Sequence, residues 1–193
     1  MEGRAKDVPS LEQLEAELER VMETSSRRRM VRDMVFFLLV VAAAAILIVV
    51  LLLPLLQIKG TSMERTLENG DLAVAVNNAR YEAGDVIAFN YNNSVLVKRV
   101  IALAGDWVDI DEDGSVYVNE QLLDEPYVNE KDLGRCNIDF PCQVPKGKIF
   151  VLGDNRKSSI DSRNTEVGCV REDAVVGEVV FRIWPLSKVS FIK

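Results

Sequence analysis

The sequence predicts a mainly β protein, with a single N-terminal transmembrane helix followed by an antiparallel β-sheet or partly open barrel. Three observations support this fold class. Residues 34–56 are apolar and uncharged, the later residues contain short apolar runs separated by turn signals, and no later run repeats its apolar residues every 3.6 positions. The 193 residues therefore divide into an N-terminal segment (1–33), a span (34–56) and one domain (57–193).

The N-terminal segment is predicted to contain a short helix. Ser10 is suited to cap its start, with Gln13 reaching back to the same turn. Apolar residues recur behind it at helical spacing: Leu11, Leu14, Leu18 and Val21. This narrow stripe fits either a coiled-coil or partner contact, or a solvated helix with Glu-rich sides, and the second interpretation is the more ordinary one.

The apolar run at residues 34–56 predicts a membrane anchor. It holds 23 residues without a charge, and as a helix it would be about 35 Å long, enough to cross the hydrocarbon core. A buried core helix would need apolar partners on all sides, which no other segment supplies. A cleaved signal peptide would have a shorter apolar core and an A-x-A-like exit, and neither is present. We therefore expect a retained span in membrane lipid, with Pro54 in its last turn.

Charges on either side of the span predict its orientation. Four arginines directly precede it: Arg27, Arg28, Arg29 and Arg32. Lys59 and Arg65 are the only nearby cations after it. By the positive-inside rule the N-terminus is cytoplasmic, so residues 57–193 are expected outside the cytoplasm of a single-pass cell-membrane protein.

Residues 57–193 are predicted to form strands where an apolar run of strand length follows a turn signal such as Asn92-Asn93 or Asp113-Gly114. The predicted strands are LAVAV (72–76), DVIAF (85–89), VLVKRVIAL (95–103), SVYV (115–118), KIFVL (148–152) and VVGEVVFRIW (175–184). The segment 120–148 is the least regular. Its Cys136 and Cys142 leave a disulfide and two free thiols equally open.

Composition excludes several kinds of site. The chain contains no histidine, which removes the Ser-His-Asp triad, the Cys-His pair and every zinc site that needs a histidine. The cysteines show no C-x-x-C spacing, so a structural zinc site or a thioredoxin-like motif is not expected. The net charge is −7 and no long basic stripe is present, which argues against a nucleic-acid partner. The sequence therefore predicts neither a metal nor a cofactor.

Three polar islands carry the candidate chemistry: residues 60–67, 97–101 and 153–163. Ser62, in the first, follows the span by six residues, so it would work near the membrane surface. Without histidine, the plausible base for a serine nucleophile is a neutral lysine. Lys98 can act as this base if its pKa falls from about 10.4 by about 3 pH units or more. Such a shift requires burial to disfavour the charged amine by an amount on the order of 4 kcal/mol.

Strand alternation predicts a dry environment for Lys98. It places the lysine on the same face as Leu96 and Val100, and Arg99 on the opposite face. A lysine with its stem in apolar surroundings and its head in water is the ordinary alternative.

The third island is dense in Gly, Asp, Asn, Ser and Arg, and its ordinary interpretation is a solvated turn. Several members could instead support a reaction. Asp161 can pair locally with Arg163, Asp154 can reach another arginine, and Ser159 can hydrogen-bond a lysine amine.

Together, the three islands resemble the motifs of the bacterial type I signal peptidases. Those motifs run approximately G-x-S-M-x-P-T-L, K-R-V-I-G-x-P-G-D and G-D-N-x-x-x-S-x-D-S-R, and all three occur here in that order. The resemblance covers the anchor and most of residues 57–193, and it implies a membrane-bound serine endopeptidase with the fold of that family. Ser62 would attack the scissile carbonyl, and Lys98 would act as general base and then as general acid.

The resemblance also implies supporting roles. Ser159 would orient the lysine amine. Asp161 with Arg163 would form an ion pair that shapes the site. Asp154 and Arg99 would be further structural supports.

Oxyanion and substrate contacts follow from the same resemblance. The Ser62 N–H would hold the oxyanion. Some relatives add a side-chain hydroxyl two residues before the nucleophile, but Gly60 offers none, so a backbone donor or water would substitute for that hydroxyl. Met63 would contact the substrate. The implied substrates are exported preproteins cut after small residues at A-x-A-like sites, whose backbone adds to a sheet edge as a strand. The short interval between Lys98 and the third island resembles the compact Gram-positive form, and no cofactor is implied.

Three residues depart from the motifs. Arg65 replaces the proline of the first motif, and Ala102 and Ala104 replace the glycine and proline that follow the lysine. None of them removes a reacting group, so the departures bear on efficiency and not on reaction type.

Two other hypotheses remain. One is a catalytically weak, anchored peptide-binding module, which a distance above about 4 Å between Ser62 Oγ and Lys98 Nζ would favour. The other is a self-cleaving regulator with the same serine–lysine pair. Such a regulator needs a cytoplasmic DNA-binding head, and the 33 residues before the span are too few and too acidic to supply it.

Overall fold

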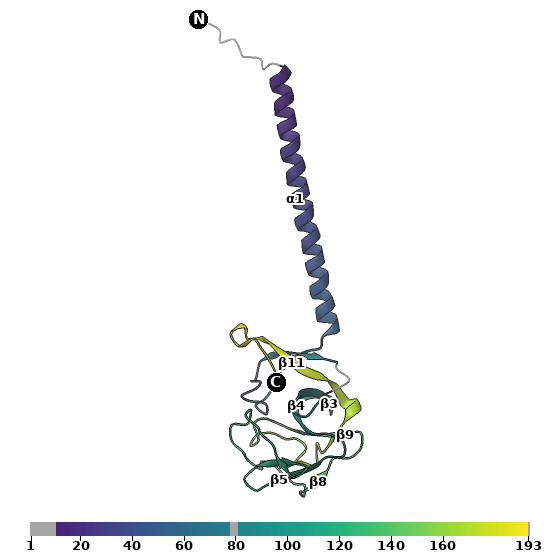
Figure 1. The fold of residues 1–193 in the computed structure, drawn as a ribbon, viewed down its shortest axis with the longest axis vertical. Coiled ribbons are helices and arrows are strands. Elements are labelled where there is room, and N and C mark those ends of the chain that lie inside the picture. The colour runs from purple at the N-terminus through teal and green to yellow at the C-terminus, as the bar shows by residue number, and fades with distance from the viewer. Residues whose placement is uncertain (1–10, 78–80, 193) are drawn as a thin grey trace. The chain divides into compact units, whose positions relative to one another are not determined.

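The computed structural model describes residues 11–77 and 81–192 and divides the chain into two units, one up to Leu51 and one from Leu52 onward. The first unit is the helix α1, Leu11–Leu52 (Figure 1). The sequence predicted a short helix and then a span through Leu56. The structure joins the two and ends the helix at Leu52, because Pro54 lacks an N–H and disfavours helical geometry in the residue before it. The cap predicted at Ser10 lies outside the described residues.

One segment of α1, Arg27–Leu47, is long and apolar enough to cross a membrane. None of it is buried by protein, and large apolar side chains such as Phe36 and Leu39 are exposed. A helix that is apolar on all sides and uncovered by protein requires another apolar medium. These properties are consistent with membrane anchoring.

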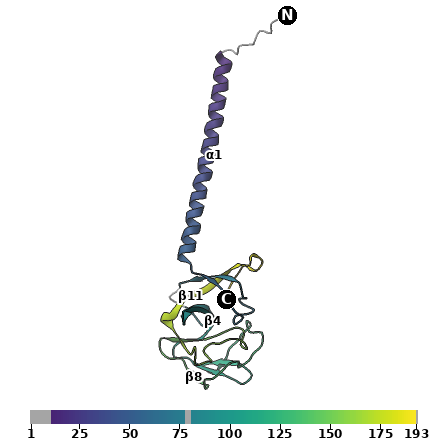
Figure 2. The same ribbon diagram turned by 180° about the vertical axis from the view of Figure 1, so that it is seen from behind.

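The second unit contains two antiparallel sheets. The larger has the order β1-β2-β11-β3-β4-β9-β10, with β12 paired to β11, and the smaller has the order β7-β6-β5-β8. In chain order the strands are β1 Leu55–Gln57, β2 Leu72–Val76, β3 Val86–Tyr91, β4 Ser94–Ala102, β5 Trp107–Ile110, β6 Val116–Val118, β7 Gln121–Leu122, β8 Cys142–Gln143, β9 Lys148–Leu152, β10 Val170–Arg171, β11 Val175–Trp184 and β12 Ser190–Phe191. Within this unit, β5 and β8 lie at the opposite end from β11, with β4 and β9 between them (Figures 1 and 2).

All six predicted strands are present, as β2, β3, β4, β6, β9 and β11, so the mainly β fold class is confirmed. Six further strands were not predicted: β1, β5, β7, β8, β10 and β12. Four of them, β7, β8, β10 and β12, have two residues each, which is too few to show an apolar alternation in the sequence. β1 lies inside the run that had been assigned to the span.

Three apolar clusters form the core of the β-rich unit, and β4 contributes to each of them. Val97 packs against the first, with Ile58 and Met63. Ile101 belongs to the second, which packs the four-stranded sheet against β4 and β9. Val100 belongs to the third, with residues of β3 and β9. Packing on all these sides holds β4 in place, and with it the lysine at its centre.

Cys136, Cys142 and Cys169 are all free thiols. The sequence left a bond between Cys136 and Cys142 open, and the structure does not form it. Burial raises the pKa of Cys142 to about 11, so this thiol is protonated at neutral pH and is a weak nucleophile.

Candidate active site

Ser62 lies in a turn between β1 and β2 that backbone hydrogen bonds hold at both ends. The N–H of Ile58 donates to Asp71 O at 2.9 Å, and the N–H of Leu67 donates to Met63 O at 2.7 Å. Gly60 enters the turn with φ +90°, a region that favours glycine, and its N–H donates to Asn69 Oδ1 at 3.0 Å. The Gly60 N–H is therefore already engaged.

Lys98 reaches Ser62 from the middle of β4. Its Nζ lies 2.7 Å from Ser62 Oγ and 3.1 Å from Val97 O. The first distance is well inside the limit of about 4 Å above which a spoiled site would be favoured. The strand register leaves one edge of β4 unpaired at Lys98. β3 pairs with Lys98 on the other edge, whereas β9 begins to pair with β4 only at Arg99.

The surroundings of Lys98 are dry, as strand alternation predicts. The lysine is only 3% exposed, and its neighbours on the same face, Leu96 and Val100, belong to one apolar cluster. Burial lowers the pKa of Lys98 from 10.5 to about 8, against the opposing effect of the carboxylates of Asp161 and Asp154. A serine–lysine pair requires this lowering of the lysine pKa. The alternative interpretation, in which the amine of Lys98 lies in water, is wrong because the side chain is buried.

Replacing Lys98 by methionine is expected to stabilise the fold. Because the folded-state pKa is about 8 and the ordinary value is 10.5, the lysine destabilises the folded state most below pH 8 and ceases to do so above 10.5. The gain at neutral pH should be up to about 3 kcal/mol. Urea unfolding of the full chain in detergent measures it, with the exposed Lys146→Met as control. A Lys98→Met chain no more stable than the Lys146→Met chain would show that the buried amine carries no such cost.

Most of the third island is buried, so the interpretation of the whole segment as a solvated turn is wrong. Its buried polar residues are Asp154, Arg156, Ser159, Asp161, Ser162 and Arg163. Arg163 Nη2 lies 2.8 Å from Asp161 Oδ2, and the other oxygen of Asp161 accepts from Arg163 Nε at 2.9 Å. Burial opposes ionisation of Asp161, but the guanidinium and the Gly153 N–H outweigh it and hold the pKa of this carboxyl below its usual range.

A second buried pair ties the island to β4. Asp154 accepts two hydrogen bonds from Arg99, from Nε at 2.9 Å and from Nη2 at 2.7 Å. Thr66, in the turn after Ser62, also donates to Asp154 through its hydroxyl. The pair therefore links the three islands, since Arg99 adjoins Lys98 and Thr66 follows Ser62.

Sequence reasoning missed a third buried pair, between Arg156 and Glu125. Arg156 Nη1 lies 3.1 Å from Glu125 Oε2, and Arg156 Nε donates to Gly153 O at 3.1 Å. Tyr127 connects this pair to the previous one, because its hydroxyl donates to Glu125 and its ring lies 3.8 Å from the Arg99 guanidinium. Arg156 lies inside the third motif, but Glu125 lies in the irregular segment 120–148, where no pattern marks it.

Ser159 is buried in the site but does not bond the lysine. The second partner of the amine is Val97 O instead, while the Ser159 hydroxyl lies near Asp161 and helps to lower the pKa of that carboxyl. The hydroxyl lies against Gly153, where a Cβ would come within 2.3 Å of Ser159 Oγ and 2.5 Å of Ser62 O. Glycine is thus required at 153 to let the third island approach the nucleophile. The hydrogen bond predicted between Ser159 and the amine is absent from the described residues.

Met63 is 2% exposed and packs in the first apolar cluster. Its side chain forms part of the wall beside Ser62 and presents little open surface. The structure thus brings together Ser62, Lys98 and the two predicted ion pairs, and it places Gly60 and Met63 in the turn around the nucleophile.

Comparisons with known proteins give a consistent result. Residues 30–184 match the family model described as signal peptidase, peptidase S26. A signal peptidase IB of Staphylococcus aureus (strain MRSA252) is 42% identical over 156 residues, covering 69% of this chain and 79% of that protein. A signal peptidase I of Bacillus caldolyticus is 42% identical over 151 residues, covering 69% of this chain and 81% of that protein.

A crystal structure of a signal peptidase I from Enterococcus faecalis V583 matches with a TM-score of 0.43 and 31% identity, over 52% of this chain and 97% of that one. The family model spans all three islands and most of the chain. The chain therefore belongs to the signal peptidase family, peptidase S26, and is a peptidase that cleaves signal peptides.

Proposed function

We propose that Ser62 is the nucleophile and Lys98 the general base of an endopeptidase that releases signal peptides from exported preproteins. The observation that carries this proposal is the 2.7 Å distance between Lys98 Nζ and Ser62 Oγ in a site where the lysine is buried and its pKa is lowered to about 8. A neutral amine at this distance can accept the hydroxyl proton.

The reaction then proceeds through an acyl-enzyme. Lys98 takes the proton of Ser62 as Oγ attacks the scissile carbonyl, and the resulting ammonium donates that proton to the leaving amine. Water, deprotonated by the same amine, hydrolyses the ester on Ser62. Val97 O accepts a hydrogen bond from Nζ and limits the rotation of the amine between these steps.

The oxyanion is held by backbone donors. The Ser62 N–H makes no hydrogen bond to the described residues and is available for it, whereas the Gly60 N–H is bound to Asn69. Asp161 with Arg163 and Asp154 with Arg99 support the site by fixing the third island and β4 against the nucleophile turn.

The preprotein binds as an added strand with small residues before the cut. Residues 94–97 of β4 pair with β3 on one edge, and no other described strand pairs with them on the opposite edge. The apolar cluster beside Ser62, which includes Ile58, Met63 and Val97, suits small side chains at A-x-A-like sites.

The proposed working position of this site is the outer surface of the membrane. Arg27, Arg28, Arg29 and Arg32 at the start of the apolar segment favour a cytoplasmic N-terminus, with the β-rich unit outside. This orientation gives the enzyme access to the signal peptides of exported preproteins, which remain in the lipid beside it.

The pH dependence of cleavage tests the proposed base. Because Lys98 must be neutral and its pKa is about 8, kcat/KM for an A-x-A preprotein should rise with pH, about tenfold per pH unit below that value, and level off above it. The assay uses the full chain in detergent, and circular dichroism at each pH controls for unfolding. A rate that is flat between about pH 6 and 9 would show that no group of this kind acts as the base.

A further inference from the structure

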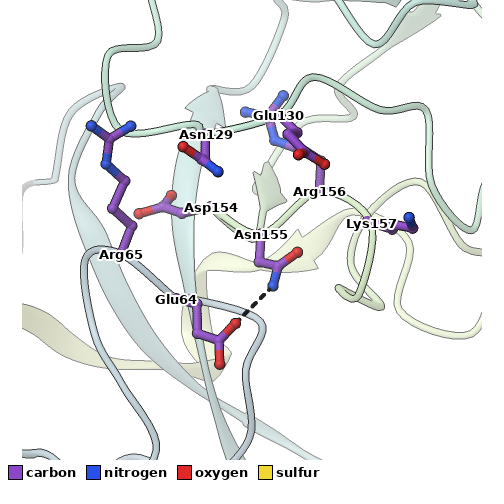
Figure 3. Close-up of a pocket in the computed structure, with 8 residues that line it drawn as sticks. All are labelled: Glu64, Arg65, Asn129, Glu130, Asp154, Asn155, Arg156 and Lys157. Atoms are coloured by element: carbon purple, nitrogen blue, oxygen red, sulfur yellow. Dashed lines mark hydrogen bonds between the residues drawn. The ribbon is translucent and has the colours of Figure 1, made fainter.

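A polar pocket opens beside the nucleophile turn. It encloses about 560 Å³ and is lined by Glu64, Arg65, Asn129, Glu130, Asp154, Asn155, Arg156 and Lys157 (Figure 3). Its walls come from the turn after Ser62, from the loop between β7 and β8, and from the turn after β9. The roles proposed above use none of its exposed side chains.

Hydrogen bonds join this pocket to Ser62. The Asn155 N–H donates to Ser62 O at 3.0 Å. Asn155 Nδ2 donates to Glu64 Oε2 at 3.2 Å, the dashed line in Figure 3. Arg65 follows Ser62 by three residues, so about 10 Å of extended chain at most separates their backbones. Two or three residues of an extended substrate cover the same distance. The pocket is therefore within reach of a peptide whose scissile carbonyl lies at Ser62.

The two sides of a preprotein cleavage site differ in chemistry. The signal peptide is apolar and has small residues before the cut, whereas the exported chain after the cut begins a water-soluble protein. The apolar cluster with Ile58 and Val97 suits the first segment. The charged pocket formed by the residues after Ser62 suits the second.

Not all charges in the pocket are available to a ligand. Asp154 is buried and paired with Arg99, and Arg156 is buried and paired with Glu125. The charged residues of the pocket that remain exposed are Glu64, Arg65, Glu130 and Lys157.

Arg65 is unusual among these exposed residues. Its φ is +85°, a region that a residue with a Cβ rarely adopts and that none of the other three exposed residues adopts. Strained backbone is concentrated at functional sites, and here it lies three residues after the proposed nucleophile. Proline, the motif residue at this position, cannot take this angle, so the turn here is built for a different side chain.

We propose that the pocket binds the first residues of the exported chain and that Arg65 selects acidic side chains at the second and third positions after the cut. The inference rests on the proposed function and adds the leaving-group side of its specificity. The guanidinium attracts a carboxylate and repels an ammonium, whereas the carboxylates of Glu64 and Glu130 in the same lining act in the opposite direction. The preference set by Arg65 is therefore moderate, and it weakens as salt is added.

Three preproteins that differ only at these two positions, with Asp-Asp, Asn-Asn or Lys-Lys, test the proposal with the full chain in detergent. The wild-type enzyme should cleave the Asp-Asp preprotein about 3- to 10-fold faster than the Lys-Lys preprotein in kcat/KM. Arg65→Gln, which keeps a Cβ at the strained position, should abolish the preference, and Arg65→Glu should reverse it. Lys59→Gln is the matched control, because Lys59 is exposed, precedes Ser62 by three residues and lies outside the pocket lining.

The outcomes separate this inference from the function on which it rests. Failure of the wild-type enzyme to cleave even the Asn-Asn preprotein would count against the proposed function. Cleavage of all three at one rate would leave that function standing and overturn the role of Arg65. A uniform loss of rate on all three preproteins in Arg65→Gln, or an equal change of preference in Lys59→Gln, would also overturn it.

Discussion

Replacing Ser62 or Lys98 by alanine is expected to lower kcat/KM for a preprotein on the order of 10⁴-fold or more while leaving the domain folded. Ser62→Ala removes the atom that would form the acyl-enzyme. Lys98→Ala removes the group 2.7 Å away that would take its proton. Lys98→Arg should fail as well, because a guanidinium stays protonated and cannot act as a base.

Cleavage of an A-x-A preprotein by each purified full-length variant measures these losses. Ser158→Ala and Lys146→Ala are matched controls, since both side chains are exposed and neither contacts the pair of reacting groups. Near-normal turnover by Ser62→Ala or Lys98→Ala would refute the proposed dyad. Circular dichroism confirms that an inactive variant is folded.

Removing the carboxylate of Asp154 is expected to give the largest loss of stability. Asp154→Ala leaves the Arg99 guanidinium, which is 1% exposed, without its bidentate partner. Breaking a buried pair in this way typically costs about 3–5 kcal/mol. Activity should fall with it, because Arg99 adjoins Lys98 and Asp154 also holds the nucleophile turn through Thr66.

Urea unfolding of the full chain in detergent measures this effect. The control is Asp173→Ala, which breaks the exposed pair between Arg171 and Asp173 and should leave the midpoint nearly unchanged. The double replacement of Arg99 by methionine and Asp154 by leucine should recover part of the lost stability, since no charge is then left unpaired. Equal losses in Asp154→Ala and Asp173→Ala would show that burial adds nothing to the first pair.

The strands show where sequence patterns suffice and where they do not. β4 and β11 are long enough for alternation to appear, and both were predicted. β1 was not, because its leucines continue an apolar run and only Pro54 marks the change from helix to strand. The same local effect ended α1 at Leu52 and not at Leu56.

The candidate site shows a similar division. The motifs named Ser62 and Lys98, which are 36 residues apart, but no sequence pattern gives the distance between their side chains. Glu125 has no motif at all, and its pairing with Arg156 depends on how an irregular segment packs. Ser159 was predicted to bond the amine, whereas the described partners of the amine are Ser62 Oγ and Val97 O.

The sequence by itself determined the apolar helix, the alternating strands and the absence of histidine, because these depend only on side-chain identity and on periodicity along the chain. Strand alternation already predicted dry surroundings for Lys98, but only the tertiary structure decided its 2.7 Å contact with Ser62 and the pairing of Glu125 with Arg156. Burial and pairing of charges depend on which distant segments pack together, and the free energy of an ionised group is set by those neighbours.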